Sequence, residues 1–168
     1  MVQLRLKDVD PRDLVAIARM LVAAVPVPVI VNNRADIALA AGAAGVHVSV
    51  DDVPASELRR VLPATFIIGA SVGSDVELSC AHGADYVGIG PVFGAGAKLD
   101  ANAAIGVEEF ARLARLAGVP AIAIGGIDES NCRQLRDAGA AGVAVIRTIF
   151  AAADPERAAR ALSSAIGS

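Results

Sequence analysis

Seven short apolar runs recur along the chain, at residues 2–6, 27–31, 45–50, 66–71, 86–90, 121–126 and 142–146. β-branched residues favour strands, and a run such as AIAI (121–124), apolar at every position, is expected of a strand buried on both faces. The segment PRDLVAIARMLVAA (11–24) has apolar residues at three- and four-residue spacing and a proline at its start, so it is predicted to be an amphipathic helix. The alternation predicts repeated βα units.

One junction occurs three times, as GAAGVHV from Gly42, GADYVGI from Gly83 and GAAGVAV from Gly139. In each copy a helix is expected to end at the glycine, which adopts positive φ without a Cβ clash, and a buried strand follows. Repeated units of this kind give an open doubly wound sheet or a closed barrel. About seven evenly spaced strands, with no GxGxxG after the first, favour the barrel. We therefore expect an α/β fold, a parallel (β/α) TIM-type barrel, in a single domain over residues 1–168.

Composition excludes several classes of protein. The formal net charge is −3 and no basic block is present, so no nucleic-acid partner is expected. No apolar run approaches the length of a membrane-spanning helix, and the N-terminus lacks the apolar core of a signal peptide. Without a CxxC motif, Cys80 and Cys132 are expected to be buried or half-buried free thiols in helices. A cytoplasmic protein is the prediction.

Polar residues gather just after the strands, where parallel barrels carry their active sites. In the first strand Gln3, Arg5 and Lys7 alternate, so all three are expected on one face, inside the barrel. Buried cationic and amide groups are costly unless an anion completes them, which points to an anion site. The alternative is an edge strand whose polar face lies in solvent.

The segment IGGI (124–127) is a candidate phosphate site. A Gly125–Gly126 turn running into a helix over SNCRQLRDAG would let backbone N–H groups approach a phosphate closely. A tight turn that needs no ligand is the alternative. Arg147, just after the last strand, would add a positive charge or lie in solvent.

Asp51 and Asp52 follow the third strand, and paired carboxylates suit Mg²⁺. One of the two is expected to cap the next helix, which leaves Asp52 as the metal ligand. His47, between two valines, is expected to be a packed core histidine, and His82 a surface residue. The long segment 90–106 is expected to be a binding loop whose single cation, Lys98, reaches a bound anion or stays solvated.

The motif set resembles the thiamine phosphate synthase family, including its thiazole tautomerase branch. The matching segments occur in family order over almost the whole chain: QLRLK (3–7), NNRADIALAAGAAGVHV (32–48), DD-P (51–54), IGAS (68–71), ADYVGIGPVF (84–93), AIGGI (123–127) and AGAAGVAV (138–145). Enzymes of this family join hydroxymethylpyrimidine diphosphate to a thiazole phosphate and release diphosphate.

The resemblance implies a role for each matching residue, and a magnesium ion. Gln3, Arg5, Lys7 and Lys98 would hold the diphosphate, which Ser71 would also contact. Asn32 and Asp52 would lie at the pyrimidine and the metal. The Gly125–Gly126 turn and the Ile146–Arg147 backbone would hold the thiazole phosphate. The metal and the cationic groups would neutralise the departing diphosphate, which lets positive charge develop on the pyrimidine methylene that the thiazole nitrogen attacks. No protein nucleophile is required.

Four departures from the family pattern qualify this picture. The chain starts at the family's second strand, so the first βα unit is expected to be absent; a partner chain in a homo-oligomer, a tolerated gap or a natural start upstream would each account for it. Asn33 stands where the family usually has Asp. Ala95 and Ala97 stand where its loop usually has threonines, and Gly73 where the tautomerase branch has a catalytic His.

The leading prediction is a thiamine phosphate synthase-like transferase of thiamine biosynthesis, with activity impaired by the substitutions at Asn33, Ala95 and Ala97. The alternative is a non-catalytic or diverged member that binds a thiazole phosphate or a similar phosphate ester. A third hypothesis is another phosphate-handling barrel enzyme, such as an isomerase or an aldolase. The aldolase is disfavoured because no strand carries a convincing Schiff-base lysine.

Overall fold

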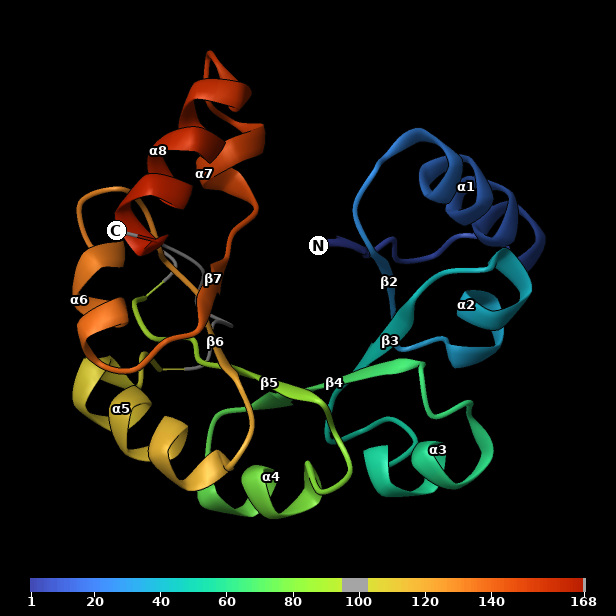
Figure 1. Ribbon diagram of the computed structural model, residues 1–168, viewed down its shortest axis with the longest axis horizontal. Coiled ribbons are helices and arrows are strands. Elements are labelled where there is room, and N and C mark those ends of the chain that lie inside the picture. The colour runs from blue at the N-terminus through green and yellow to red at the C-terminus, as the bar shows by residue number, and fades with distance from the viewer. Residues whose placement is uncertain (95–102, 168) are drawn as a thin grey trace. The chain divides into compact units, whose positions relative to one another are not determined.

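The computed structural model describes residues 1–94 and 103–167, and in that part of the chain strands and helices alternate (Figure 1). The strands are β1 (Val2–Leu4), β2 (Val29–Asn32), β3 (Gly45–Val48), β4 (Ile67–Val72), β5 (Tyr86–Ile89), β6 (Ala121–Ile124) and β7 (Gly142–Ala144). The helices are α1 (Pro11–Ala24), α2 (Ala35–Ala41), α3 (Ala55–Val61), α4 (Asp75–Cys80), α5 (Gly106–Ala117), α6 (Cys132–Asp137), α7 (Arg147–Phe150) and α8 (Pro155–Gly167).

All seven predicted strands are confirmed, although several end earlier than the apolar runs suggest. β1 stops at Leu4 rather than at residue 6, and β7 stops at Ala144 rather than at residue 146. Among the described strands β1 pairs with β2, and β7 pairs with β6. A strand held along one side has fewer ladder hydrogen bonds, which explains why these two are the shortest.

The chain divides into two compact units. The first comprises Met1–Ser71 with Ser79–Asp85, and the second comprises Val72–Leu78 with the chain from Tyr86 onward. In the first unit β1 to β4 pair in parallel in chain order, and α1 and α2 pack against one another beside β2 and β3 (Figure 1). Its core is made of β-branched side chains with no more than 1% exposure, among them Ile30, Val31, Val46 and Ile68.

Helix α1 forms over the predicted residues. Asp10 lies at its N-cap and accepts a hydrogen bond from the amide of Arg12 at 2.9 Å, and Pro11 occupies the first helical position, where no amide hydrogen is needed. Its apolar face buries Leu14 and Ala18. The helix ends at an extended residue, Val25.

Arg59 of α3 ties together the part of the first unit where β4 begins. Its guanidinium donates to the carbonyl of Phe66 at 3.0 Å and to that of Gly83 at 3.3 Å, and it forms an ion pair with Asp85. The Asp85 carboxylate also accepts from the amide of Ile68 at 2.7 Å. One half-buried arginine therefore fixes a helix, a strand and a turn.

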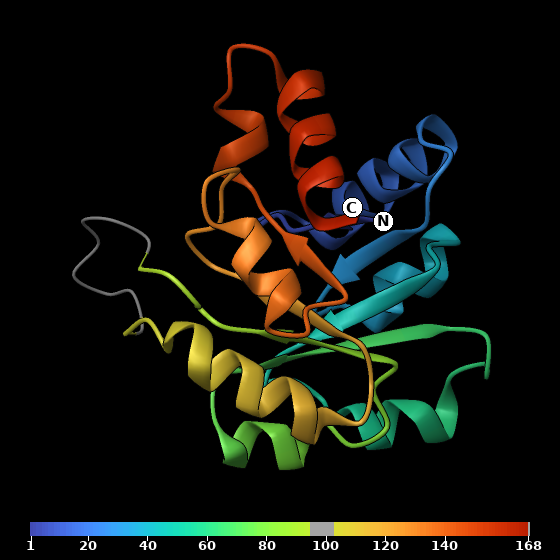
Figure 2. The same ribbon diagram turned by 60° about the vertical axis from the view of Figure 1, so that its left-hand side comes forward.

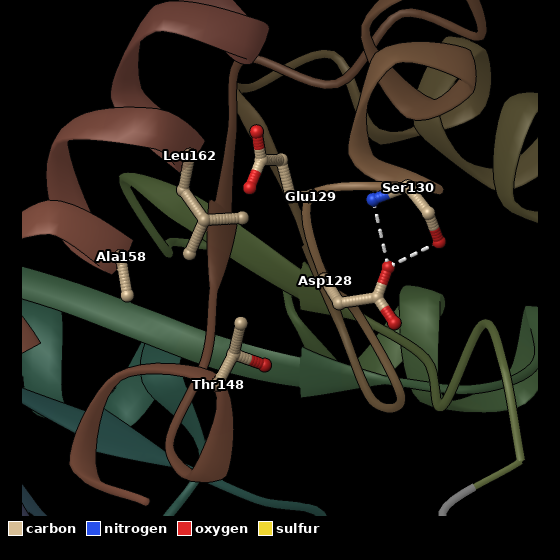
Figure 3. Close-up of a pocket in the computed structure, with 6 residues that line it drawn as sticks. All are labelled: Asp128, Glu129, Ser130, Thr148, Ala158 and Leu162. Atoms are coloured by element: carbon tan, nitrogen blue, oxygen red, sulfur yellow. Dashed lines mark hydrogen bonds between the residues drawn. The ribbon is translucent and has the colours of Figure 1, made fainter. Parts of the chain in front are cut away.

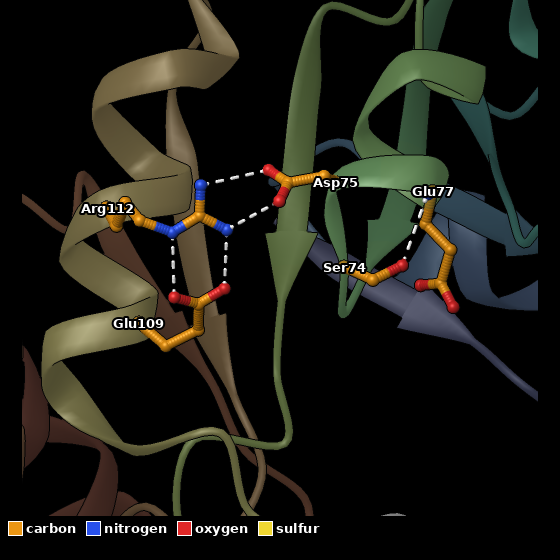
Figure 4. Close-up of polar contacts among 5 residues, drawn as sticks. All are labelled: Ser74, Asp75, Glu77, Glu109 and Arg112. Carbon is orange, nitrogen blue, oxygen red and sulfur yellow. Dashed lines mark hydrogen bonds and ion pairs between the residues drawn. The ribbon is translucent and has the colours of Figure 1, made fainter.

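In the second unit β5, β6 and β7 pair in parallel, and α8 packs against α6 and α7 (Figure 2). Its core contains Phe110, Leu113 and Leu135, each fully buried. Figure 4 shows how α4 and α5 are joined: Arg112 forms ion pairs with Asp75 at 2.9 Å and with Glu109 at 2.6 Å.

The positive φ predicted for the three repeated glycines is confirmed, with values of 70° at Gly42, 91° at Gly83 and 96° at Gly139. The helix ends at the glycine only in the first copy, because α4 ends at Cys80 and the C-cap of α6 is Ala138. The cysteine prediction is half right. Both thiols are free, but Cys132 is buried whereas Cys80, the last residue of α4, is exposed. No described helix has the length and hydropathy to cross a membrane.

Candidate functional site

Four polar side chains of the first unit lie on one face of its strands. Gln3 pairs with Ile30 in register, and Asn32, two residues along β2, pairs with His47 of β3. His47 pairs with Gly69, and Ser71 lies two residues further along β4. Since side chains alternate along a strand with period two, Gln3, Asn32, His47 and Ser71 share this face. The last three lie at or near the carboxyl ends of their strands, where parallel sheets place their sites.

His47 and Ser71 are in direct contact. The Nε2 atom of His47 lies 2.9 Å from the Ser71 hydroxyl oxygen. Burial lowers the pKa of His47 to about 4, although the negative charge of Asp52 acts in the opposite direction. The imidazole is therefore neutral at pH 7. The prediction of a buried histidine is confirmed, but the residue also orients a proposed substrate contact.

The Asp52 side chain accepts hydrogen bonds from Ser49 and does not cap a helix. Its Oδ2 atom accepts from the Ser49 amide at 2.7 Å and from the Ser49 hydroxyl at 2.6 Å. The expectation that one carboxylate of the Asp51–Asp52 pair caps the next helix is wrong, because α3 has Pro54 at its N-cap and no side-chain cap. Asp52 follows Ser49 by three positions, and its amide donates to the Ser49 carbonyl, so the chain forms a turn before α3 begins.

Asp52 and Asn33 both carry side-chain oxygens of the kind that magnesium binds. Asn33 has φ of +62°, and its side-chain oxygen accepts a hydrogen bond from the side-chain amide of Asn32 at 2.6 Å. No group of three or more His, Cys, Asp or Glu that could hold a metal occurs in the described residues. A Mg²⁺ ion takes one or two carboxylates and completes its shell with waters and substrate phosphates. The position of Asp52 fits an ion that takes one protein carboxylate.

Gln3, Arg5 and Lys7 are exposed. The expectation that they are buried on an interior face is wrong, since β1 is a three-residue strand that pairs with β2 alone among the described strands and ends before Arg5. Their polar groups are solvated in this state. They remain free to accept an anion without a desolvation cost in its absence.

In the second unit the Gly125–Gly126 turn packs against the segment that follows β5. Gly125 has φ of +90°, and a Cβ there would come within 2.5 Å of the Pro91 side chain. Gly126 has φ of +66°, and a Cβ there would come within 2.6 Å of the Phe93 carbonyl oxygen. Both positions therefore require glycine for backbone conformation and for space.

The carbonyl groups of this turn are all held. Those of Ile124 and Gly125 accept from the amides of Val92 at 2.8 Å and Phe93 at 3.1 Å. That of Gly126 accepts from the Asn131 side chain at 3.0 Å, and that of Ile127 from the Thr148 hydroxyl at 2.5 Å.

The amides of Gly126 and Ile127 are not held in this way. In a trans peptide the N–H points opposite to the carbonyl, so these two amides point away from the groups that hold the carbonyls of their own peptides. Among the described residues none accepts a hydrogen bond from either amide. Two neighbouring free amides next to residues of positive φ form a concave donor pair that suits a phosphate.

The helix predicted over residues 130–139 is present as α6, but it begins at Cys132, so the glycine turn does not run directly into it. Asp128 and Asn131 build a separate turn first. The Asp128 carboxylate accepts from the Ser130 amide at 2.9 Å and hydroxyl at 2.6 Å, which lowers its pKa below the ordinary range (Figure 3). Asn131 Oδ1 accepts from the Asp128 amide at 2.9 Å. Residues 128–131 therefore form this turn instead of a first turn of α6.

Ile146 and Arg147 are exposed and open the short helix α7, with Ile146 at its N-cap. Lys98, Ala95 and Ala97 lie outside the described residues. A cavity of ≈ 340 Å³ lies beside the turn (Figure 3), and its lining residues are Asp128, Glu129, Ser130, Thr148, Ala158 and Leu162.

The sequence did not predict the side chains that form hydrogen bonds to the candidate site residues. His47 contacts Ser71, and Ser49 donates to Asp52. Asn131 and Thr148 donate to carbonyls of the glycine turn. Ser49 could have been found from its three-residue spacing to Asp52, which is typical of a side chain that closes a turn. The partners of Ser71 and Ile127 lie 24 and 21 residues away and leave no local signal.

Comparisons with known proteins support the resemblance. The family model described as thiamine monophosphate synthase matches residues 1–149. A thiamine-phosphate synthase of Roseiflexus sp. (strain RS-1) is 44% identical over 172 aligned residues, which cover 99% of this chain and 73% of the relative. A thiamine phosphate pyrophosphorylase structure from Pyrococcus furiosus superposes with a TM-score of 0.86 and 34% identity, covering 98% of this chain and 81% of that one.

These likenesses also confirm the fold class predicted from sequence, the parallel β/α TIM-type barrel class. A 3-hexulose-6-phosphate synthase structure superposes with a TM-score of 0.72 at 22% identity, over 98% of this chain and 86% of that chain. At that level of identity the likeness concerns the fold alone.

Proposed function

Because the chain belongs to the thiamine monophosphate synthase family, we propose that it is a transferase of thiamine biosynthesis, which joins hydroxymethylpyrimidine diphosphate to a thiazole phosphate. The observation that carries the proposal is the Gly125–Gly126 turn, whose carbonyls are held and whose amides at Gly126 and Ile127 donate to no described residue. Such a turn is suited to a phosphate monoester, and the thiazole substrate carries one.

The reaction breaks the bond between the pyrimidine methylene carbon and a diphosphate oxygen, and diphosphate leaves with the electron pair. The thiazole nitrogen supplies the pair for the new C–N bond and becomes a cationic ring nitrogen. No proton transfer and no protein nucleophile are needed, so the task of the protein is to orient the reactants and to stabilise separating charges.

The first unit supplies the groups proposed for the diphosphate. Arg5 and Lys7 would contribute positive charge, and Gln3 and Ser71 would donate hydrogen bonds. The Ser71 hydroxyl is already oriented by a neutral His47, which cannot repel a cationic centre. Asn32, which lies beside His47 in register, would contact the pyrimidine. Lys98 keeps the role that the family resemblance implies, at the diphosphate.

Asp52 is the proposed magnesium ligand. Ser49 fixes its carboxylate from two directions, so little side-chain entropy would be lost on binding the metal. A bound Mg²⁺ would neutralise part of the charge on the departing diphosphate. Asn33 cannot supply the second carboxylate, and we expect weaker magnesium binding than a two-carboxylate site would give.

The second unit supplies the groups proposed for the thiazole phosphate. The free amides of Gly126 and Ile127 would donate to its oxygens, with the Gly125 conformation shaping the turn and the Ile146–Arg147 backbone contributing from α7. The exposed Arg147 would add a compensating charge. A cytoplasmic location belongs to the same proposal, because charged phosphate esters do not cross membranes unaided.

The test is to incubate purified protein with both substrates and Mg²⁺ and to quantify thiamine phosphate by chromatography. We expect slow but measurable formation that depends on all three components. Calorimetric titration with the thiazole phosphate alone checks the binding half separately. Folded protein that binds the thiazole phosphate yet forms no product would contradict the transferase and leave a binding protein.

A further inference from the structure

We propose that Thr148 is a positioning residue for the thiazole phosphate: its hydroxyl fixes the Gly126–Ile127 turn relative to the Ile146–Arg147 backbone, so that both segments can reach one phosphate. The proposal rests on the proposed function, since that function supplies the phosphate. It concerns a hydroxyl on α7 that contacts the turn and not the substrate.

The contact itself is short and sheltered. The Thr148 hydroxyl donates to the Ile127 carbonyl at 2.5 Å in a half-buried environment, and it connects residues 21 positions apart. Strands β6 and β7 pair only as far as Ile124 and Ala144. Beyond that point, in the part of the chain that the structure describes, this is the hydrogen bond that ties the turn to α7.

Both segments depend on contacts from elsewhere. α7 has four residues, too few to be stable as an isolated helix, and none of its residues is buried. The turn has positive φ at Gly125 and Gly126, which an untethered chain would populate only in part. The hydrogen bond from Thr148 to Ile127 therefore determines how far the amides of the turn lie from those at the start of α7.

Asn131 holds the other side of the same turn. Its side chain donates to the Gly126 carbonyl and accepts from the Asp128 amide. Asn131 anchors the Gly126 carbonyl, which shares its peptide with the Ile127 amide, and Thr148 anchors the next carbonyl, so two consecutive peptides are fixed. The amide of Ile127 is thus oriented before any phosphate arrives, and binding avoids the entropy cost of ordering it.

The experiment compares wild-type protein with Thr148→Val, which keeps the shape and removes the hydroxyl, and with Thr148→Ser, which keeps the hydroxyl. By calorimetry, Thr148→Val should weaken binding of the thiazole phosphate about three- to tenfold, the range expected for one net hydrogen bond. Thr148→Ser should restore affinity to within about twofold of wild type. In the steady state the KM for the thiazole phosphate should rise in Thr148→Val, while kcat and the KM for the pyrimidine diphosphate stay unchanged.

The matched control is Thr65→Val, which alters an exposed threonine in the first unit and should change neither constant. Unchanged affinity in Thr148→Val would overturn the proposal, and so would a Ser variant as weak as Val, because the effect would then belong to packing. Should Thr148→Val fail to fold, Thr148→Ala provides the same comparison with Ser.

A second readout separates this proposal from the function on which it rests. The amide resonances of Gly126 and Ile127 are followed by NMR during titration with inorganic phosphate. If wild-type protein binds no thiazole phosphate, the proposed function fails. Hydroxyl-dependent phosphate shifts at these amides would still support the role of Thr148, whereas the absence of any shift would overturn both.

Discussion

The imidazole of His47 and the hydroxyl of Ser71 lie 2.9 Å apart, on one face of adjacent strands β3 and β4. The pair brings a buried titratable group into contact with a side chain proposed to bind diphosphate. Burial keeps the imidazole neutral at pH 7, so protonating it would place an unsolvated charge inside the first unit. Acid stability and substrate binding should therefore depend on the same residue.

The first prediction concerns stability against pH. The pKa of His47 is lowered from 6.5 to about 4 in the folded protein, so between these values the unfolded chain binds more protons. Stability is then fully present above pH 6.5 and is lost as pH falls towards 4, by up to about 3 kcal/mol. Urea unfolding at pH 7 and pH 4.5 measures the loss. His47→Asn should reduce the pH dependence.

His82 is the control for this effect, because it is exposed. His82→Gln should leave the pH dependence as it is in the wild-type protein. Equal flattening in both variants would assign the acid sensitivity to groups other than His47. NMR titration of the His47 imidazole gives an independent check, since it should resist protonation at pH 5.

The second prediction separates backbone strain from steric clash at the glycine turn. Gly118 and Gly126 have the same φ of +66°, but a Cβ at Gly118 meets open space whereas one at Gly126 meets Phe93. Gly118→Ala should cost only the strain of positive φ, about 1–2 kcal/mol. Gly126→Ala should cost about 2–5 kcal/mol, because overpacking adds to the strain. Chemical denaturation measures both; equal losses would mean that the Phe93 backbone moves aside freely.

The strands and the first helix could be predicted because their signals are local. The run of valine and isoleucine before Asn32, and the apolar spacing after Pro11, depend on residues within a few positions of each other. The Gly125–Gly126 turn could also be predicted, since two consecutive glycines directly after a strand are typical of a tight turn. Its packing against Pro91 and Phe93 could not, because that contact joins segments more than 30 residues apart in sequence.

The burial of the first-strand cations was predicted wrongly for a physical reason. Alternation of Gln3, Arg5 and Lys7 predicts a shared face only where the chain is a strand, and it carries no information about how far the strand runs or how many neighbours it has. β1 pairs along one side with β2 and ends at Leu4, so the basic side chains stay in solvent. The number of neighbours is a tertiary property.

The third prediction restores the family's second carboxylate. Asn33→Asp keeps the acceptor that the Asn32 side chain uses at 2.6 Å, and aspartate tolerates the φ of +62° nearly as well as asparagine. The Mg²⁺ concentration for half-maximal rate should fall about tenfold, and turnover should rise. Thiamine phosphate formation is measured against Mg²⁺ concentration. Asn33→Gly, which relieves the φ without adding charge, should give no gain; a gain in both variants would point to backbone relaxation.

The last prediction compares two neighbouring arginines of α3. Arg59 has 27% of its side chain exposed, donates to two carbonyls and pairs with Asp85. Arg60 is 75% exposed and pairs with Glu57, within the same helix. Methionine at either position keeps the apolar stem and removes the guanidinium. Arg59→Met should lower the free energy of unfolding by about 1–3 kcal/mol, because partly sheltered carbonyls lose their donors, whereas Arg60→Met should change it by less than about 0.5 kcal/mol. Urea denaturation of both variants measures the difference.

Similar losses in the two variants would show that both arginines act through surface charge, and these losses should then shrink in high salt. A loss that is confined to Arg59→Met and insensitive to salt would show that hydrogen bonding to the chain fixes α3 against β4.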